Sequence, residues 1–253
     1  MTVIELYRYL DEHIPSSLSC EWDNDGLMCC PDGAAEVKRV LVTLDVTSDA
    51  IETAKKEGCE AIVSHHPLIF RGVKSVNCGE VVPSRVIELI KNNITAMSFH
   101  TRLDAVSGGV NDLLAIRLGI KEAEPFGECG IGRIGTLENP MPLDDFARLV
   151  KQSLGAPTVQ YADAGKEVYK VAVLGGSGGD DVPAALALGA DTYVSGEFSY
   201  HALADAPEGD MNLIEAGHFY TEEPVCEALA DLVSSADSSI KIIKHFSCRT
   251  KTI

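Results

Sequence analysis

Two stretches of the sequence, 131 residues apart, share one strand–helix–strand pattern, and this repeat constrains the fold more than any other feature. Each stretch places an apolar strand before a helix that ends at glycine and then a second apolar strand. The residues that match without a gap are Val40 with Val171, Val42 with Val173, Ala54 with Ala185, Gly58 with Gly189, and Ser64 with Ser195. Repetition of one supersecondary unit predicts two related α/β lobes.

The order of the expected elements is typical of the α/β class. Strands are expected at 39–44, 61–64, 94–99, 168–174, 192–195, 212–216 and 240–245, and helices at 3–14, 48–57, 84–91, 110–118, 143–154, 180–188 and 221–233. Such alternation favours mixed, largely parallel sheets. Because the pattern loosens after residue 121, we assign residues 1–121 and 205–253 to the first lobe and residues 122–204 to the second.

Histidines and acids gather at the ends of the expected strands. Four of the seven histidines follow a strand directly, and these are His65, His66, His100 and His218. Asp104 and Glu222 each lie four residues after one of these histidines. Because ligand sites of open parallel sheets lie at the carboxyl ends of the strands, we expect a metal site in the crevice between the lobes. Imidazole and carboxylate together suit Zn, Mn, Fe or Ni, and the set is large enough for two divalent ions.

Simpler interpretations exist for each of these residues. A single histidine is usually a surface or hydrogen-bonded residue, and Glu222 with Glu223 can be the acidic first turn of a helix. The glycine-rich segment 175–179 lacks the lysine of a phosphate-binding loop, which favours a tight turn. Ser195 and Ser199 lack the G-x-S-x-G context of a nucleophile, so His201 is expected to line the crevice or cap a turn.

Seven segments resemble, in order, the dinuclear-metal family known as GTP cyclohydrolase I type II homologues, which is also named after a yeast interacting factor. They are Trp22-Asp23-Asn24-Asp25-Gly26-Leu27, Leu44-Asp45-Val46-Thr47, Ser64-His65-His66-Pro67, His100-Thr101-Arg102-Leu103-Asp104-Ala105, Gly132-Arg133-Ile134-Gly135, Gly175-Gly176-Ser177-Gly178 and Gly217-His218-Phe219-Tyr220-Thr221-Glu222. The likeness covers nearly the whole chain.

The resemblance implies a ligand set for two metal ions, with Glu222 bridging both and His100 close by, where it either supports a ligand or faces the substrate. The implied ligands are His65, His66, Asp104, His218 and Glu222. It also implies a ring-shaped homohexamer without the extra central domain of longer relatives. Arg102 stands where many relatives have a small polar residue, which points to altered anion recognition, and Glu197 stands where they usually have Asp.

Composition excludes several classes of protein. The 253 residues are 45% hydrophobic and 23% charged, as in an ordinary globular protein, and the net charge of −17 disfavours nucleic-acid partners. Without a run of about 18 apolar residues or an apolar leader, a cytoplasmic protein with no membrane contact is expected. The eight cysteines form no C-x-x-C pair and are expected to be free thiols.

Two functions are consistent with these residues. The first is a metal-dependent hydrolase of a small anionic or nucleotide substrate, with His100 or His201 as the catalytic residue for proton transfer and GTP ring opening as one candidate reaction. The alternative is a non-enzymatic metal-binding protein with a regulatory or interaction role.

Overall fold

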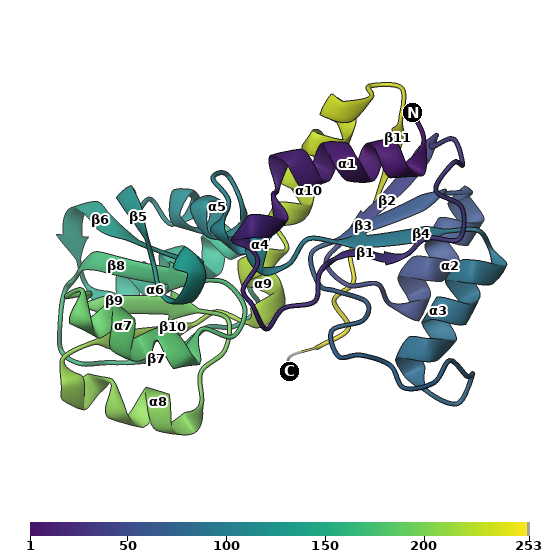
Figure 1. The fold of residues 1–253 in the computed structure, drawn as a ribbon. Coiled ribbons are helices and arrows are strands. Elements are labelled where there is room, and N and C mark those ends of the chain that lie inside the picture. The colour runs from purple at the N-terminus through teal and green to yellow at the C-terminus, as the bar shows by residue number, and fades with distance from the viewer. Residues whose placement is uncertain (252–253) are drawn as a thin grey trace. The chain divides into compact units, whose positions relative to one another are not determined.

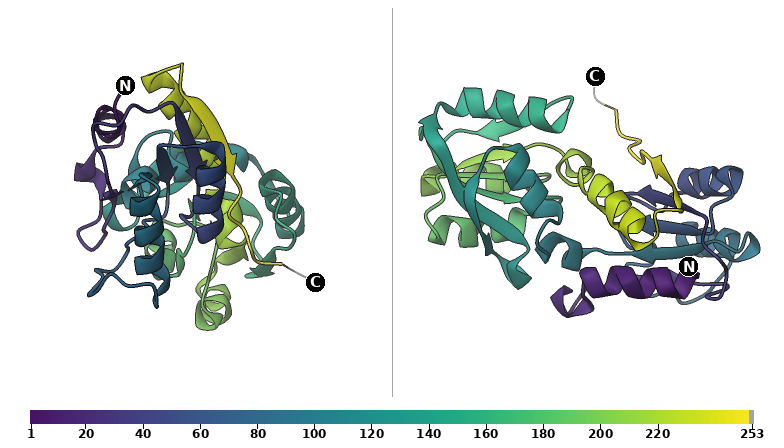
Figure 2. Two further views of the ribbon diagram at one scale, coloured as in Figure 1. Left: turned by 90° about the vertical axis from the view of Figure 1, so that its right-hand side faces the viewer. Right: turned by 90° about the horizontal axis from the view of Figure 1, so that it is seen from above.

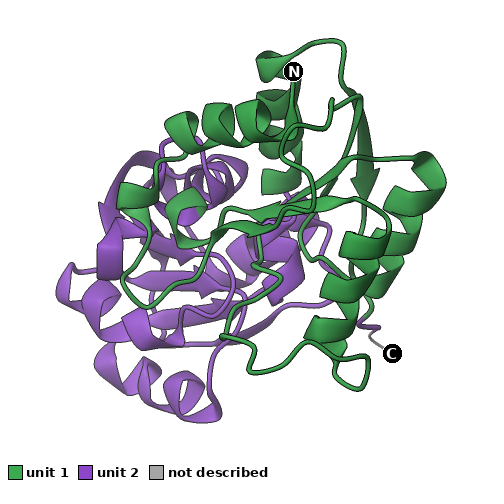
Figure 3. Cartoon of the chain, turned by 45° about the vertical axis from the view of Figure 1, so that its right-hand side comes forward, with its two compact units in different colours: residues 1–103, 225–249 green, residues 104–224, 250–253 purple. Residues whose placement is uncertain are grey.

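The computed structural model describes residues 1–251, which form two compact units (Figure 3). Unit 1 comprises Met1–Leu103 and Val225–Arg249, and unit 2 comprises Asp104–Pro224 with the C-terminal residues from Thr250. Unit 1 holds a five-stranded mixed sheet and unit 2 a six-stranded one. The expected α/β class with two lobes is therefore confirmed.

The sheet of unit 1 has the strand order β1-β4-β3-β2-β11. Its strands are β1 (Gly26–Cys29), β2 (Arg39–Thr43), β3 (Ala61–Ser64), β4 (Thr95–Ser98) and β11 (Lys241–His245). All neighbours are parallel except β1, which runs antiparallel to β4. Every residue of β3 and β4 is buried, as expected for central strands covered on both faces.

Helices cover both faces of this sheet (Figure 1). Its helices are α1 (Val3–His13), α2 (Ser48–Glu57), α3 (Val81–Lys91) and α10 (Val225–Ala236), with the short helix η1 (Ser16–Leu18). The short helix α4 (Thr101–Ala105) begins in unit 1 and ends in unit 2. In the picture α1 and α10 lie on one face and α2 and α3 on the other. Ala50, Ile51 and Ala54 of α2 pack with Leu41 and Ile62 of the sheet in one apolar core.

The sheet of unit 2 has the strand order β5-β6-β8-β9-β10-β7. Its strands are β5 (Lys121–Phe126), β6 (Gly132–Met141), β7 (Gln160–Ala162), β8 (Val168–Leu174), β9 (Thr192–Ser195) and β10 (Asn212–Glu215). The pairs β8–β9 and β9–β10 are parallel and the other three are antiparallel, so this sheet is less parallel than expected.

The helices of unit 2 are α5 (Val110–Arg117), α6 (Leu143–Leu154), α7 (Val182–Ala187), α8 (Tyr200–Asp205) and α9 (His218–Glu222), with η2 (Glu128–Gly130), η3 (Gly179–Asp181) and η4 (Pro207–Gly209). Figure 2 shows α6 and α7 on opposite faces of the sheet. The sequence assignment placed residues 205–224 in the first lobe, whereas the hydrogen bonds of β10 to β9 place Asn212–Glu215 in the second sheet. Residues 104–121 likewise belong to unit 2, since α5 packs on β6 and β8.

The internal repeat is reproduced in the register of the strands. Val40 pairs with Ala61 in unit 1, and Val171, 131 residues later, pairs with Thr192 in unit 2. After the first strand of each repeat, β2 or β8, the chain forms a helix that is followed within two residues by a glycine with positive φ, Gly58 at 69° and Gly189 at 77°. The expectation of two related units is borne out at this level. Among the residues described, no helix has the length and apolar character needed to cross a membrane.

Candidate metal centre

Three imidazoles of unit 1 gather at the carboxyl ends of β3 and β4. His65 and His66 follow β3, and His100 follows β4 after one residue. One ring nitrogen of each lies within 4.8 Å of the corresponding nitrogen of the other two. We call His65, His66 and His100 the imidazole cluster. Its position agrees with the expectation that ligands gather where parallel strands end.

Each ring of the imidazole cluster is hydrogen-bonded through Nδ1 to an oxygen. His65 Nδ1 lies 3.0 Å from the Phe99 carbonyl oxygen, His66 Nδ1 lies 2.8 Å from Asp45 Oδ1, and His100 Nδ1 lies 2.9 Å from Asp23 Oδ1. Because a carbonyl or an ionised carboxylate only accepts, Nδ1 carries the hydrogen and Nε2 carries the lone pair. Metal-binding histidines usually have this arrangement, so the imidazole cluster fits a metal ion.

The carboxylate that orients His100 is buried. Asp23 has a fully buried side chain and also accepts hydrogen bonds from the Thr101 backbone nitrogen at 3.0 Å and from Thr101 Oγ1 at 2.7 Å. Burial by itself raises the pKa of Asp23, but the hydrogen bonds from His100 and Thr101 outweigh it and hold the pKa well below its usual value. Asp23 is therefore ionised at neutral pH and fixes the ring of His100.

Unit 2 contributes a histidine–glutamate pair at the carboxyl end of β10. His218 is the first residue of α9, and Glu222 lies one turn later on the same helix face. His218 Nε2 lies 3.0 Å from Glu222 Oε2, and His218 Nδ1 lies 3.5 Å from Glu197 Oε2. Glu222 is 4% exposed, which shows that it is not merely a solvated acid in a first helical turn. Asp104 of α4 is also buried.

A glycine makes room for this pair. Gly176 follows β8 with φ +71°, and a Cβ atom built there would clash with Glu222 Oε1 and lie 3.2 Å from His218 Nε2. The Gly176 nitrogen donates to Thr221 Oγ1 at 3.0 Å, which ties the loop to α9. The glycine-rich segment 175–179 is thus a turn, as the sequence favoured, and it also shapes the surroundings of two candidate metal ligands.

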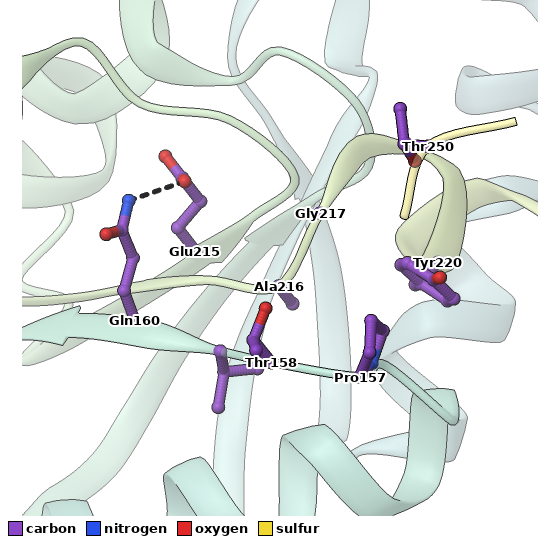
Figure 4. Close-up of a pocket in the computed structure, with 9 residues that line it drawn as sticks. Pro157, Thr158, Gln160, Glu215, Ala216, Gly217, Tyr220 and Thr250 are labelled. Carbon is purple, nitrogen blue, oxygen red and sulfur yellow. Dashed lines mark hydrogen bonds between the residues drawn. The ribbon is translucent and has the colours of Figure 1, made fainter. Parts of the chain in front are cut away.

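Two cavities of unit 2 lie near His218. One of about 300 Å³ is lined by Ser177, Gly179, Asp180, Glu197, Phe198 and Ser199, and Glu197 is the neighbour of His218. The other, of about 380 Å³, is drawn in Figure 4 and has Gly217 in its wall. In its wall Gln160 donates to Glu215 Oε1 at 2.6 Å, and Glu215 Oε2 accepts from the Phe198 nitrogen at 2.7 Å, so these polar groups satisfy one another.

His201 and Arg102 lie outside the imidazole cluster, and only the expectation for Arg102 is overturned. His201 is exposed on α8, and no group of three or more metal-donor side chains among the described residues includes it. Arg102 is 1% exposed, and its guanidinium bonds to Asp11, Asp25 and the Ile14 carbonyl. The expectation that Arg102 alters anion recognition is therefore corrected, because its charge is neutralised inside unit 1.

Two functional residues were missed at the sequence level, namely Asp23 and Asp45, which hold His100 and His66. Asp45 lies just beyond the carboxyl end of β2, so the rule that identified the histidines also applied to it. Asp23 lies in a loop 77 residues before His100, and no local pattern marks it as the partner of that histidine.

Comparison with known proteins agrees with the seven segments. A family model described as Duf34/NIF3 (NGG1p interacting factor 3) matches residues 1–252. A Clostridium perfringens protein named GTP cyclohydrolase 1 type 2 homolog is 35% identical over 96% of this chain and 95% of its own length.

Solved structures show the same fold. Staphylococcus aureus protein SA1388 has a TM-score of 0.89 and 27% identity over 100% of this chain and 99% of its own. Reduced HcgD from Methanocaldococcus jannaschii has a TM-score of 0.85 and 27% identity over 96% of this chain and 97% of its own. With a family model that matches almost every residue and a fold shared along its whole length, this chain belongs to the Duf34/NIF3 family.

Proposed function

We propose that this protein is a metal-dependent hydrolase that acts on a small anionic or nucleotide substrate. The observation that carries the proposal is the imidazole cluster, in which three rings are oriented through Nδ1 and offer one ring nitrogen each within 4.8 Å of one another. The names of the curated relatives add ring opening of GTP as a specific candidate reaction.

The proposed ligands are imidazole and carboxylate side chains. His65, His66, Asp104, His218 and Glu222 would hold two divalent ions, as the family resemblance implies. The donors are nitrogen and carboxylate oxygen, a set that suits Zn, Mn, Fe or Ni. When bound, two such ions supply Lewis acidity, polarise the scissile group and lower the pKa of water.

The other residues would position the substrate and move protons. His100 is oriented by Asp23, its ring lies 5.3 Å from that of His65, and it would accept or donate a proton through Nε2. In the smaller cavity, Ser177 and Ser199 carry hydroxyl groups that would bind polar groups of a substrate. His201 stays a proposal for proton transfer that depends on the bound position of the substrate.

The first test is metal-dependent turnover. The purified protein is stripped with a chelator, reloaded with Zn, Mn, Fe or Ni, and assayed on nucleotides that include GTP and on small phosphate esters. Hydrolysis that disappears on stripping and returns on reloading supports the proposal. Binding of metal without turnover of any substrate favours the non-enzymatic alternative. The hexameric ring implied by the resemblance is part of the proposal, and the native mass in light scattering tests it.

The second test is the variant Glu222→Gln. Glutamine keeps the shape but lacks the charge that lets a carboxylate bind two cations, so we expect the loss of at least one bound ion and of hydrolysis, without unfolding. The neighbouring Glu223→Gln is the matched control and should retain wild-type metal content. Elemental analysis that finds two ions at wild-type affinity in Glu222→Gln would show that the centre is built from other residues.

A further inference from the structure

Two exposed aromatic rings lie beside the imidazole cluster. Trp22 is 53% exposed and Phe70 is 45% exposed, and their ring centroids are 6.2 Å apart in an edge-to-face arrangement. The His100 ring lies 6.4 Å from Trp22 and 5.9 Å from Phe70, again edge-to-face. We call Trp22 and Phe70 the aromatic platform. It borders the candidate metal centre within unit 1.

The loop that carries Trp22 is held in place on both sides. The Asp23 nitrogen donates to the Cys20 carbonyl at 3.0 Å, which closes a turn with Trp22 in its centre. The Cys20 nitrogen in turn donates to Thr101 Oγ1 at 3.0 Å. Asn24, which follows Asp23, donates from its side chain to the Ile69 carbonyl oxygen. This hydrogen bond joins the loop that carries Trp22 to the loop that carries Phe70. The aromatic platform is therefore preorganised, not a mobile surface feature.

Exposure of an indole on such a loop needs an explanation. Tryptophan gains more than most residues from burial, yet about half of this side chain faces solvent while Asp23 beside it is fully buried. Flat π-surfaces next to polar, metal-binding groups are typical of sites that bind a planar ring and orient a reactive group attached to it.

The charge near the platform favours an anionic ligand. The exposed segment directly after Phe70 carries Arg71 and Lys74, two cations in a protein whose net charge is −17. A phosphate attached to the bound ring would be attracted to these two cations, whereas the exposed Glu21 directly before Trp22 would repel it near that residue.

We propose that Trp22 and Phe70 bind a planar heteroaromatic ring, such as a nucleobase, in an anionic substrate of this protein. Because the planes of Trp22 and Phe70 are 80° apart, the bound ring stacks face to face on one of them and packs edge-to-face against the other. The inference rests on the proposed hydrolase function and deepens it by naming the substrate class. The ring stacks on the platform, and the group to be cleaved then lies next to His100 and the other imidazoles.

The experiment uses the intrinsic fluorescence of Trp22, the one tryptophan in the chain. The metal-loaded protein is titrated with guanosine 5′-monophosphate and, in parallel, with ribose 5-phosphate, which has the sugar and the charge but no heteroaromatic base. We expect saturable quenching by the first probe and none by the second. Equal responses to both probes would overturn the inference, because the ring would then contribute nothing.

Variants separate stacking from simple proximity. Calorimetry should show that Phe70→Leu and Trp22→Leu each weaken binding of guanosine 5′-monophosphate, by about 5- to 100-fold for the ring that stacks on the base and by less for the ring that packs edge-to-face. Trp22→Phe, which keeps a ring, should recover most of the affinity. Ile90→Ala is the matched control, since Ile90 is apolar, belongs to unit 1 and is also 53% exposed. This variant should bind guanosine 5′-monophosphate with the affinity of the wild type.

Other outcomes are also decisive. Unchanged affinity in both leucine variants, with metal content equal to wild type, would overturn the inference. So would an emission spectrum that shifts with protein concentration in the absence of a probe, because a second copy would then cover the platform. Quenching by the nucleotide without hydrolysis of any substrate refutes the proposed function alone, whereas hydrolysis without ring recognition refutes this inference alone.

Discussion

At the scale of single residues, the chemistry of the candidate metal centre depends on the oxygens that accept hydrogen bonds from Nδ1 of the three histidines. Oxygens of Phe99, Asp45 and Asp23 favour one tautomer in the three neighbouring imidazoles, with the hydrogen on Nδ1 and the lone pair on Nε2. Two of the three acceptors are carboxylates, which also make the imidazoles better ligands. The residues behind the histidines are thus as important as the histidines themselves.

Asp23→Asn should lower stability in a pH-dependent way. The pKa of Asp23 is lower in the folded than in the unfolded state, so its stabilising effect is fully present above about pH 4 and is lost as the pH falls through the folded value. We expect the variant to be about 2–3 kcal/mol less stable at pH 7, a typical cost for a buried carboxylate with several hydrogen bonds.

Urea unfolding of both proteins at pH 7, 5 and 3 measures this difference. Because asparagine does not titrate, the difference in the free energy of unfolding between wild type and Asp23→Asn should become smaller below about pH 4. If this difference in the free energy of unfolding stays constant from pH 7 to pH 3, the ionisation of Asp23 does not stabilise the fold.

Arg102→Met should be strongly destabilising, although methionine fits a buried position. The variant would leave the buried carboxylate of Asp25 without its guanidinium partner, at an expected cost of about 3–5 kcal/mol. Arg148→Met is the control, because the Arg148 side chain is 66% exposed in its ion pairs with Asp144 and Asp145. The control should lose less than about 0.5 kcal/mol of the free energy of unfolding. Equal effects in chemical denaturation would contradict the structural role of Arg102.

At the scale of elements, the two repeated units use one scaffold with different loops. In unit 1 the loop after β2 carries Asp45, which holds His66, and Thr47, whose side chain accepts from the Ala50 nitrogen and caps α2. In unit 2 the loop after β8 is the glycine-rich segment 175–179, which approaches His218 and Glu222 closely. The position after the repeated strand is therefore occupied by an acid, Asp45, in unit 1 and by a glycine without a side chain, Gly176, in unit 2.

Gly176→Ala tests the importance of that space. The new Cβ would clash with Glu222 Oε1, and φ +71° is unfavourable for alanine, so we expect a loss of metal affinity together with a destabilisation of about 1–3 kcal/mol. Gly179→Ala is the control within the same loop, since its Cβ would have no neighbour closer than 3.9 Å. Isothermal titration with Zn or Mn and thermal unfolding compare the two, and equal metal affinity would refute the role given to Gly176.

At the scale of the whole molecule, the charge of −17 opposes association with polyanions. We expect no saturation of a labelled DNA duplex at physiological salt up to about 100 µM protein, because few phosphate contacts can offset such a field. Fluorescence anisotropy measures this directly, and the same titration at low salt is the control. Tight binding that weakens steeply with salt would reveal a local basic surface strong enough to outweigh the net charge.

The sequence by itself determined the elements whose patterns are local. The structure reproduces the predicted bounds of α2, β3, α6, β8 and β9, where apolar periodicity, a capping residue or a terminal glycine lies within a few residues. It also determined that histidines lie at strand ends, since strand position and residue identity are both local properties.

Strands β5 and β6 were missed because their signals are not local. In β5 every residue but Phe126 is exposed, so no apolar alternation marks it. In β6, Gly132 and Gly135 are residues that strands usually avoid, but a Cβ at either would clash with the Phe126 ring or the Lys121 carbonyl of the neighbouring strand. These glycines are needed for close approach, which a sequence pattern does not reveal.

Tertiary structure alone decided which groups meet. It joined Asp23 to His100 across 77 residues, enclosed Arg102 between carboxylates instead of exposing it to a ligand, and placed β10 in the second sheet. Local propensity and periodicity act over one or two turns of chain, so they fix elements. The partner of a side chain depends on how those elements pack, and packing depends on the whole chain.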